Sequence, residues 1–256
     1  MTTSKHKLRQ VLVGFLVLVL ISVMLRMGIW QLERHAWRQQ FNSRVLAQID
    51  QPVLDLNQFP IPGDLWDMEY RKAEVRGVYD YSEEVLLRNQ VWVEPGQALP
   101  GFHVLTPLII QGSKQAIYIN RGWIPLGDAA PEKRAAYQEI GVQTIRGVIR
   151  RPQTTPEIGG IPDPTRIPGQ PRLETWNLVN LERLQEQTTL SLLPVYLQQS
   201  PDPSWQSLPY RSEPVLEITA GNHIFFAISW FALAAVILYF YGRSLTKKPT
   251  AVVGGK

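Results

Sequence analysis

Two long apolar segments, one near each end of the chain, constrain this sequence more than any other feature. Residues 11–30 read VLVGFLVLVLISVMLRMGIW, with Arg26 as the one charged residue, and residues 223–241 read HIFFAISWFALAAVILYFY. A helix rises about 1.5 Å per residue, so about 20 apolar residues cross the hydrocarbon core of a bilayer. We therefore predict two transmembrane helices, and we expect the long side chain of Arg26 to reach the membrane interface.

Each segment has one competing interpretation. The first combines a basic start with an apolar core, as a cleaved signal peptide does, but small residues do not follow the core and Arg26 stands where they would be expected. The second has the length of a buried core helix, but few soluble helices are apolar on every side over such a length. An uncleaved anchor and a second membrane helix are therefore the preferred interpretations.

Charge is distributed unevenly along the chain, whose formal net charge is +4. All 22 Asp and Glu lie between Glu33 and Glu217, whereas several Lys and Arg lie outside these limits, next to the apolar segments. Basic flanks of this kind are typical of the cytoplasmic side of a membrane and do not indicate a nucleic-acid-binding face. We therefore predict cytoplasmic tails at residues 1–10 and 242–256, with residues 31–222 exported.

The exported region is predicted to be mainly β. Residues 31–49 continue the first helix as far as Pro52, and short alternating segments follow, separated by Gly and Pro. The strands are expected at residues 73–79, 84–88, 101–110, 115–121, 142–150, 173–179 and 195–198, and short helices at 131–139 and after Asn180. Such spacing favours a small antiparallel barrel or sandwich, and the proline-rich residues 151–171 form a long loop.

Catalytic motifs are absent from the sequence: it has no G-x-S-x-G, H-E-x-x-H or phosphate-binding G-x-x-x-x-G-K pattern. The chain also contains no cysteine, which excludes disulfides, thiolate metal sites and cysteine nucleophiles. We therefore expect a protein that is not an enzyme.

His223 is the histidine that invites a functional interpretation, because it begins the second apolar segment. It is either an ordinary residue at a helix start or an axial ligand of haem iron, for which neutral imidazole is common. In the second case Phe225, Phe226 and Trp230 would line an apolar slot, and cations would meet the propionates; the candidates are Arg26, Arg34 and Arg121. The other histidines, at positions 6, 35 and 103, are expected to be solvated or packed.

Aromatic and basic residues cluster just after the first apolar segment, at Trp30, Arg34, Trp37 and Arg38. Interfacial Trp and Arg are ordinary membrane anchors, so the cluster by itself does not indicate a site. The segment 120–123, Asn-Arg-Gly-Trp, equally fits a strand end followed by a turn glycine.

Taken in order, these motifs resemble those of the surfeit locus protein 1 family. Residues 28–38 resemble its G-x-W-Q-x-x-R-x-x-W-K signature, with Arg38 in place of the usual lysine. Residues 106–108 and 120–125 resemble its T-P-L and V-N-R-G-W-V-P motifs. Residues 222–231 resemble its N-x-H-L-x-Y-A-x-Q-W-F ending, with Phe226 and Ser229 replacing tyrosine and glutamine. The residues concerned include Gly28, Trp30, Gln31, Arg34, Trp37, Arg38, Asn120, Arg121, Gly122, Trp123 and His223.

The resemblance implies a role in the biogenesis of haem-copper oxidases, chiefly cytochrome c oxidase. It implies two membrane helices around an exported domain, transient binding of haem A and delivery to the catalytic subunit, alongside other assembly factors. His223 matches the family histidine that is the implied iron ligand. We expect Phe226 and Trp230 to contact the macrocycle and Arg26 or Arg34 to meet the propionates.

Two other functions stay open at the level of sequence. A scaffold would stabilise a partly assembled oxidase subunit without touching haem, through its membrane helices and exported domain. A membrane enzyme acting on haem or lipid is the third class. Because the chain starts almost directly with its anchor and shows no Arg- and Ser-rich transit peptide, we expect a bacterial inner membrane.

Overall fold

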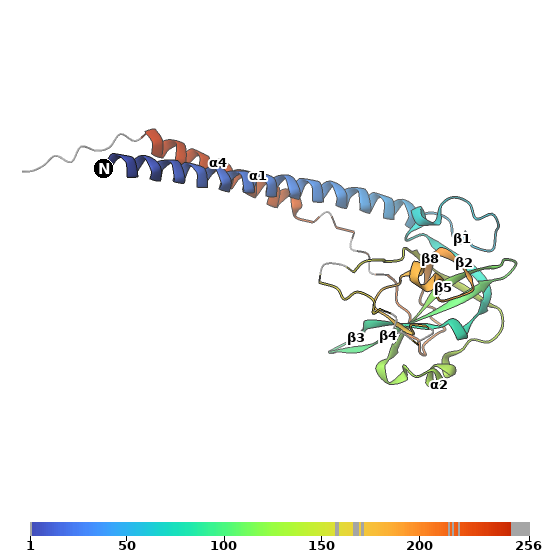
Figure 1. Cartoon of the computed structure of the whole chain (residues 1–256). Coiled ribbons are helices and arrows are strands. Elements are labelled where there is room, and N and C mark those ends of the chain that lie inside the picture. Colours follow the sequence, from blue (N-terminus) through green and yellow to red (C-terminus); the bar gives the residue numbers. More distant parts are fainter. Residues whose placement is uncertain are drawn as a thin grey trace, which may run out of the picture. The chain divides into compact units, whose positions relative to one another are not determined.

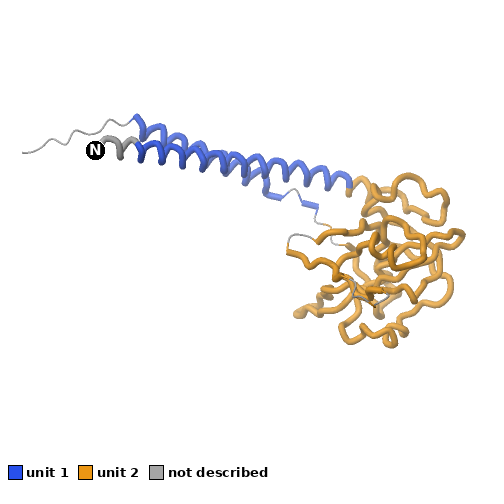
Figure 2. Tube along the Cα trace, viewed as in Figure 1, with its two compact units in different colours: residues 1–44, 217–256 blue, residues 45–216 orange. Residues whose placement is uncertain are grey.

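The computed structural model describes residues 2–156, 159–165, 169, 172–214, 216, 218–219 and 221–246, with side chains from Leu8 onward. The chain divides into two compact units (Figure 2). Residues 1–44 and 217–256 form a helical unit, and residues 45–216 form a β-rich unit. Residues 31–44, which the sequence analysis grouped with the exported domain, thus belong with the helices.

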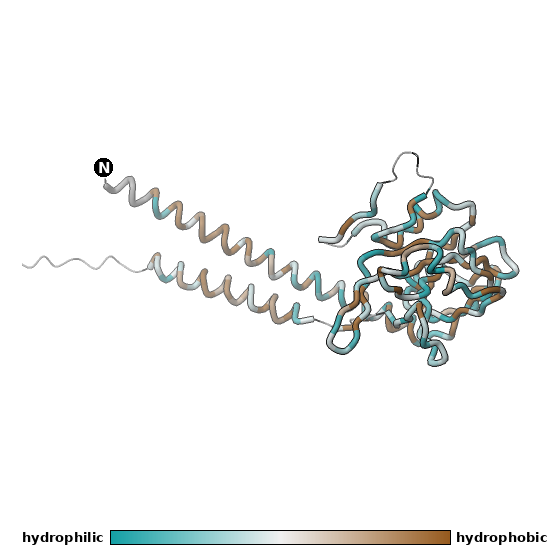
Figure 3. Tube along the Cα trace, turned by 90° about the horizontal axis from the view of Figure 1, so that it is seen from below, coloured by the Kyte–Doolittle hydropathy of each residue, from teal (hydrophilic) through white to brown (hydrophobic). Residues whose placement is uncertain are grey.

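The helical unit contains two long helices, α1 (Thr2–Ile49) and α4 (His223–Thr246) (Figure 1). Within them, Leu8–Ile49 and His223–Thr246 are long and apolar enough to cross a membrane. Figure 3 shows the apolar residues, in brown, along both helices. These two helices fit a two-pass membrane protein.

The two helices pack antiparallel through small residues. A Cβ atom on Gly28 would lie 2.5 Å from the Phe231 ring, and one on Gly14 would lie 2.7 Å from the Tyr241 hydroxyl. Since Gly14 faces the later residue of α4 and Gly28 the earlier one, the helices run in opposite directions. Close approach through glycine is how apolar helices associate in lipid, where the hydrophobic effect does not drive them together.

The less exposed positions of both helices repeat at alternating spacings of three and four residues. Such a repeat places every member on one face, as in the seam between paired helices. On α1 these positions are Gly14, Val17, Ile21, Met24, Gly28 and Gln31, and on α4 they are His223, Ala227, Trp230, Ala234 and Ile237. The seam is apolar over most of its length and ends in the polar residues Gln31 and His223.

The β-rich unit is a closed barrel of five strands. Neighbouring strands follow the order β2-β6-β8-β5-β4, and β4 pairs with β2 to close the ring. The β5–β8 pair is parallel and the other four pairs of the ring are antiparallel. The strands are β1 (Leu54–Asp55), β2 (Lys72–Tyr79), β3 (Val85–Glu94), β4 (Gln97–Ile110), β5 (Gln115–Pro125), β6 (Gln143–Arg150), β7 (Thr175–Trp176) and β8 (Ser191–Gln199).

The fold class predicted from the sequence is therefore confirmed: apolar helices near both termini flank a β-rich barrel with short helices. Two of these are α-helices, α2 (Pro131–Arg134) and α3 (Leu181–Gln185). At the start of α3, the Asn180 side chain accepts a hydrogen bond from the Arg183 backbone N–H at 3.2 Å. Four 3-10 turns complete the unit: η1 (Leu65–Met68), η2 (Tyr81–Glu83), η3 (Leu126–Asp128) and η4 (Ala135–Tyr137).

Some element boundaries differ from the prediction. The strand expected at 173–179 pairs only at Thr175–Trp176, the two residues of β7, which contact β3. β3 continues six residues beyond Arg88, because its far half pairs with the start of β4 after a bulge between Leu87 and Gln90. Of the predicted loop 151–171, the residues that the structure describes form no helix or strand, and the others lie outside the described residues.

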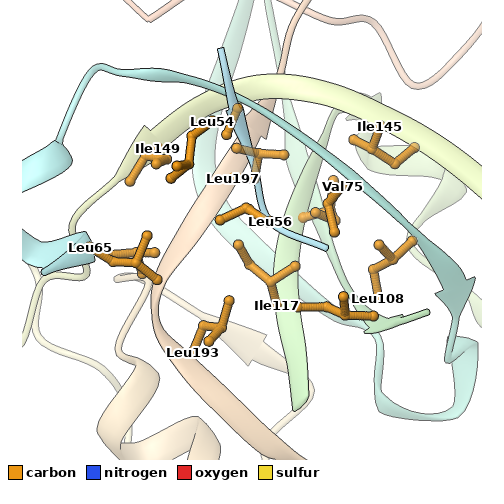
Figure 4. Close-up of a cluster of buried hydrophobic side chains, with 14 of the residues drawn as sticks. Leu54, Leu56, Leu65, Val75, Leu108, Ile117, Ile145, Ile149, Leu193 and Leu197 are labelled. Atoms are coloured by element: carbon orange, nitrogen blue, oxygen red, sulfur yellow. The ribbon is translucent and has the colours of Figure 1, made fainter. Parts of the chain in front are cut away.

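The core of the barrel is aliphatic. Alternate residues of the strands point inward, and Figure 4 shows Leu56, Val75 and Ile117 among the side chains gathered there. Val75, Ile117 and Leu197 have no exposed surface. The barrel interior is thus filled by packed aliphatic side chains.

Candidate functional site

His223 and Gln31 meet across the helix pair. The Nδ1 atom of His223 lies 2.9 Å from Oε1 of Gln31, although the two residues are 192 positions apart in the chain. Gln31 follows directly on the predicted first span and His223 begins the second. The pair therefore lies where the apolar stretches of both helices end.

Gly221 shapes the other edge of the His223 ring. Its φ of +64° is in the left-handed region that favours glycine, and a Cβ there would lie 2.9 Å from Cδ2 and 3.0 Å from Nε2 of the imidazole. Any larger residue at this position would press against the ring. The imidazole is thus hydrogen-bonded at Nδ1 and flanked by bare backbone at Nε2.

Aromatic residues continue from His223 along α4. Phe226 and Trp230 lie three and seven residues further on, which places them on the same side of the helix as the imidazole. Phe225, two residues on, is rotated by about 200°, and it is 69% exposed. Of the aromatic residues named from the sequence, Phe226 and Trp230 therefore accompany His223, and Phe225 does not.

The motif on α1 divides between two faces of the helix. Gly28, Gln31 and Arg38 lie on the seam side, whereas Trp30 and Trp37 face outward and are 45% exposed each. The Arg34 guanidinium lies 4.3 Å from the centre of the Trp37 ring. One sequence motif thus supplies both the helix contact and an exposed aromatic-basic surface.

Arg26 lies away from His223. It precedes Gly28 by two residues, so it projects about 200° from the Gly28 contact. Its guanidinium lies 3.3 Å from Glu33, and both side chains are more than half exposed. The structure therefore does not bring Arg26 together with the imidazole, whereas Arg34 is one turn from Gln31 on the same helix.

Arg121 is buried within the β-rich unit. It is the extra residue of a bulge in β5, where Asn120 pairs with Leu105 and Gly122 with Val104. The bulge turns the side chain inward, and it is only 1% exposed. Arg121, which the sequence offered as one candidate for the haem propionates, is therefore a buried residue of the β-rich unit.

Two carboxylates, the buried Glu84 and the partly buried Glu139, hold the Arg121 guanidinium. Its nitrogens lie 3.0 Å from Glu139 and 3.6 Å from Glu84, and its charged group stacks against Tyr79 at 4.9 Å from the ring centre. Glu84 is shared with Arg134 at 2.7 Å. The sequence did not reveal these partners, because no fixed spacing links Glu84 and Glu139 to Arg121.

Gly122 and Trp123 fix the strand end beside Arg121. The φ of Gly122 is +122°, and a Cβ would lie 2.4 Å from the Tyr210 carbonyl oxygen. The Trp123 N–H donates to that same oxygen at 2.8 Å, and the two aromatic rings stack at 5.9 Å. The segment 120–123 is accordingly a structural element of the barrel.

His103 is also part of the barrel. Its Nδ1 lies 3.1 Å from the Asn120 amide nitrogen, which donates to it. Burial lowers the pKa of His103 to about 4, so the ring is neutral near pH 7. Among the described residues, no group of three His, Cys, Asp or Glu side chains has the arrangement of a metal site.

Comparisons with known proteins show which family this chain is similar to. A model of the SURF1 family matches residues 18–235, which extend from α1 through the barrel into α4. Surfeit locus protein 1 of Homo sapiens is 26% identical over 254 residues, covering 90% of this chain and 77% of the human protein. The rat protein of that name is 23% identical over 240 residues (88% and 73%), and a SURF1-like protein of Monosiga brevicollis is 27% identical over 222 residues (83% and 79%). The chain belongs to the SURF1 family.

Proposed function

We propose that this protein is an assembly factor for a haem-copper oxidase of the cytochrome c oxidase type. It binds haem A at the end of its paired membrane helices and helps to deliver it to the catalytic subunit. Family membership supports the assembly role. The observation that carries the haem-binding part is the His223 imidazole, held at Nδ1 by Gln31 at 2.9 Å where both apolar helices end.

The residues around His223 fit a haem. A neutral imidazole ligates iron through one nitrogen while the other is hydrogen-bonded. Gly221 leaves the Nε2 edge free of a side chain, and Phe226 and Trp230 offer apolar surface on the same side of α4. Haem A is apolar over most of its surface, so binding at membrane depth keeps that surface out of water.

Arg34 is the cation that the geometry favours for the haem propionates. It lies on α1 within one turn of Gln31, on the exposed surface that it shares with Trp30 and Trp37, and its guanidinium lies over the Trp37 ring. Arg26, the other candidate from the sequence, pairs with Glu33 on the far face of the helix. In this proposal the protein's own residues bind and orient the cargo, and they catalyse no reaction.

The test is the haem content of the detergent-purified protein from cells that make haem A, with His223→Ala beside it. We expect bound haem A in the wild type, read from the visible spectrum and by extraction, and its loss in the variant at equal protein yield. Phe225→Ala, which changes an exposed aromatic residue of the same helix turned away from His223, is the matched control. Equal haem content in all three proteins would remove His223 from the role.

A scaffold without haem is the second candidate function. The exposed Trp30 and Trp37, with Arg34 between them, form a surface on α1 that suits a protein partner, because Trp and Arg dominate many interfaces. In that case Trp37→Ala would reduce recovery of the oxidase catalytic subunit in a pull-down, and His223→Ala would leave it unchanged. The opposite pattern would favour the haem-binding function.

We place the protein in a bacterial inner membrane, with both termini cytoplasmic and the barrel exported. The antiparallel packing of α1 and α4 supports it, because Arg9 and Arg243 then flank the spans on one side, as the positive-inside rule requires. A reporter fused at position 256 should be active as a cytoplasmic fusion, and one inserted near Gly112 as an exported fusion. The reverse pattern would contradict this topology.

A further inference from the structure

We infer that Gln31 is a positioning residue that sets the tautomer of His223, placing the hydrogen on Nδ1 and the free electron pair on Nε2. The inference deepens the proposed function and rests on it for the identity of the ligand. Its starting point is the contact between Nδ1 and the Gln31 side-chain oxygen at 2.9 Å.

The chemistry of the two groups determines the direction of this hydrogen bond. The Oε1 atom of glutamine accepts hydrogen bonds and cannot donate, so the Nδ1 atom that faces it carries the hydrogen. A neutral imidazole has one such hydrogen, so its Nε2 atom keeps an available electron pair. Free neutral histidine in water prefers the opposite tautomer, with the hydrogen on Nε2. Gln31 therefore reverses the preference and prepares Nε2 as a ligand atom.

The helix seam holds Gln31 in place for this task. Gly28, one turn earlier on the same face, lets α1 approach α4 so closely that a Cβ would enter the Phe231 ring. Beyond the pair, the Asn42 side chain donates to the Thr219 carbonyl at 3.2 Å, which ties α1 to the segment that precedes α4. With contacts on both sides of it, the Gln31 amide is confined opposite the imidazole.

The Nε2 edge is the side of the ring that a ligand can approach. Within the described part of the chain, only Nδ1 of this imidazole is hydrogen-bonded, and the residue against Nε2 is Gly221, which has no side chain. A ligating histidine typically donates its second N–H to an oxygen of the protein, which orients the ring and increases its basicity. Gln31 and His223 have this arrangement, with the acceptor supplied by the partner helix.

Two substitutions of Gln31 separate a hydrogen-bonding role from a packing role. Gln31→Leu keeps the approximate volume and removes the acceptor, whereas Gln31→Glu keeps an acceptor oxygen at the same place. Gln39→Leu makes the first change at an exposed position of the same helix and serves as the control. A role in packing alone predicts that the Leu variant behaves like the wild type.

The first measurement requires no haem. Full-length protein with 15N-labelled histidines is observed in detergent by NMR at about pH 8, where ordinary imidazoles are neutral, and His223→Ala assigns the signal. We expect the Nδ1–H tautomer in the wild type, in Gln39→Leu and in Gln31→Glu, and conversion toward the Nε2–H tautomer in Gln31→Leu. An Nε2–H tautomer in the wild type, or no change in Gln31→Leu, would overturn the inference.

The second measurement adds haem A and keeps the two proposals distinguishable. Loss of an outer partner of a metal ligand typically weakens binding by about 10- to 100-fold, so Gln31→Leu should retain about 10-fold less haem than the wild type or Gln39→Leu. Gln31→Glu should retain haem and shift its reduction potential downward, because a carboxylate acceptor makes the imidazole a stronger donor. If the tautomers behave as expected but the wild type binds no haem, the proposed function fails and the assignment of Gln31 stands.

Discussion

The polar motif residues of the barrel and those of the helix pair differ in what surrounds them. In the barrel, the Arg121 guanidinium is 1% exposed and lies between Glu84 and Glu139, so its charge is matched within the unit. In the helix pair, the His223 imidazole is hydrogen-bonded to Gln31 at Nδ1, and its Nε2 edge lies against Gly221, which has no side chain.

In the proposed function, this difference separates residues that maintain the fold from residues that bind the ligand. A buried charge whose carboxylate partners come from the same unit ties segments of that unit together, and removing it breaks buried ion pairs. An imidazole with one hydrogen-bonded nitrogen can still bind a ligand through its other nitrogen. Both sets occur in the family motifs, so membership of a motif does not by itself indicate which role a residue has.

The largest effect that this comparison predicts is on the stability of the barrel. Arg121→Ala removes the buried guanidinium that bridges Glu84 and Glu139, and although Arg134 and Arg211 still pair with these carboxylates, we expect a loss of about 3 kcal/mol of unfolding free energy. The measurement is urea unfolding of the full-length protein in detergent, followed by tryptophan fluorescence.

Arg146→Ala is the matched control for that experiment, because Arg146 also pairs with a glutamate, Glu74, but its side chain is 79% exposed. An exposed pair of this kind contributes about 1 kcal/mol or less. Similar small effects of the two substitutions would show that the buried charges do not stabilise the barrel.

The next effect concerns the backbone beside Arg121. Gly122→Ala adds a Cβ 2.4 Å from the Tyr210 carbonyl oxygen at a φ of +122°, and we expect a loss of about 2–3 kcal/mol. Gly96→Ala, at a φ of +87° with open space around it, should cost about 1 kcal/mol. The same unfolding assay compares them, and equal losses would mean that the Tyr210 contact adjusts without strain.

A smaller effect is expected in the helix pair, where the substitution changes the packing of α1 against α4 and not the pairing of charges. Gly28→Leu would place a side chain in the Phe231 ring and separate α1 from α4. Since the chain has no cysteine, Ile21→Cys with Ala234→Cys, both on the seam, reports helix contact through disulfide formation. We expect Gly28→Leu to slow formation of this disulfide about fivefold, which corresponds to a loss of about 1 kcal/mol in helix association.

Gly242→Leu is the control for that cross-link, since nothing lies within 4 Å of a Cβ at this position of α4. It should leave the rate of disulfide formation unchanged. If Gly28→Leu also leaves the rate unchanged, the two helices associate through contacts other than the glycine seam.

The smallest effect is a dependence of barrel stability on pH. Burial lowers the pKa of His103 to about 4, against an ordinary value of about 6.5 in the unfolded chain. As the pH falls from about 6.5 to about 4, the unfolded chain therefore binds a proton that the folded one does not, and stability is lost. Between pH 7 and pH 6 we expect the loss to be about 0.7 kcal/mol greater in the wild type than in His103→Asn. Equal losses would show that His103 titrates alike in both states.

Much of the fold could be predicted because its signals are local. The spans follow from about twenty consecutive apolar residues, and β2, β6 and the β4–β5 hairpin follow from short alternating segments between turns. The prediction was wrong at residues 173–179, where pairing with β3 and not local preference decides that only two residues form a strand. The parallel β5–β8 pair likewise depends on ring closure, which no local pattern encodes.

The candidate site was predictable only in part. His223 stood out because an imidazole at the start of an apolar helix is rare enough to notice, and Gln31 was named only as part of a motif. The burial of Arg121 could not be predicted, because one extra residue in β5 sets the direction of its side chain. A strand pattern alone does not show where a bulge occurs.

By itself, the sequence determined that two apolar helices flank a β-rich domain, because apolar length and alternation act on neighbouring residues. Only the tertiary structure decided which polar groups meet. Gln31 and His223 are 192 residues apart, and Arg121 finds its carboxylates from two other segments of the barrel. Such pairs form because distant segments pack closely, through Gly28 in the helices and the β5 bulge in the barrel. The positions of these residues in the sequence do not reveal which distant segments will pack together.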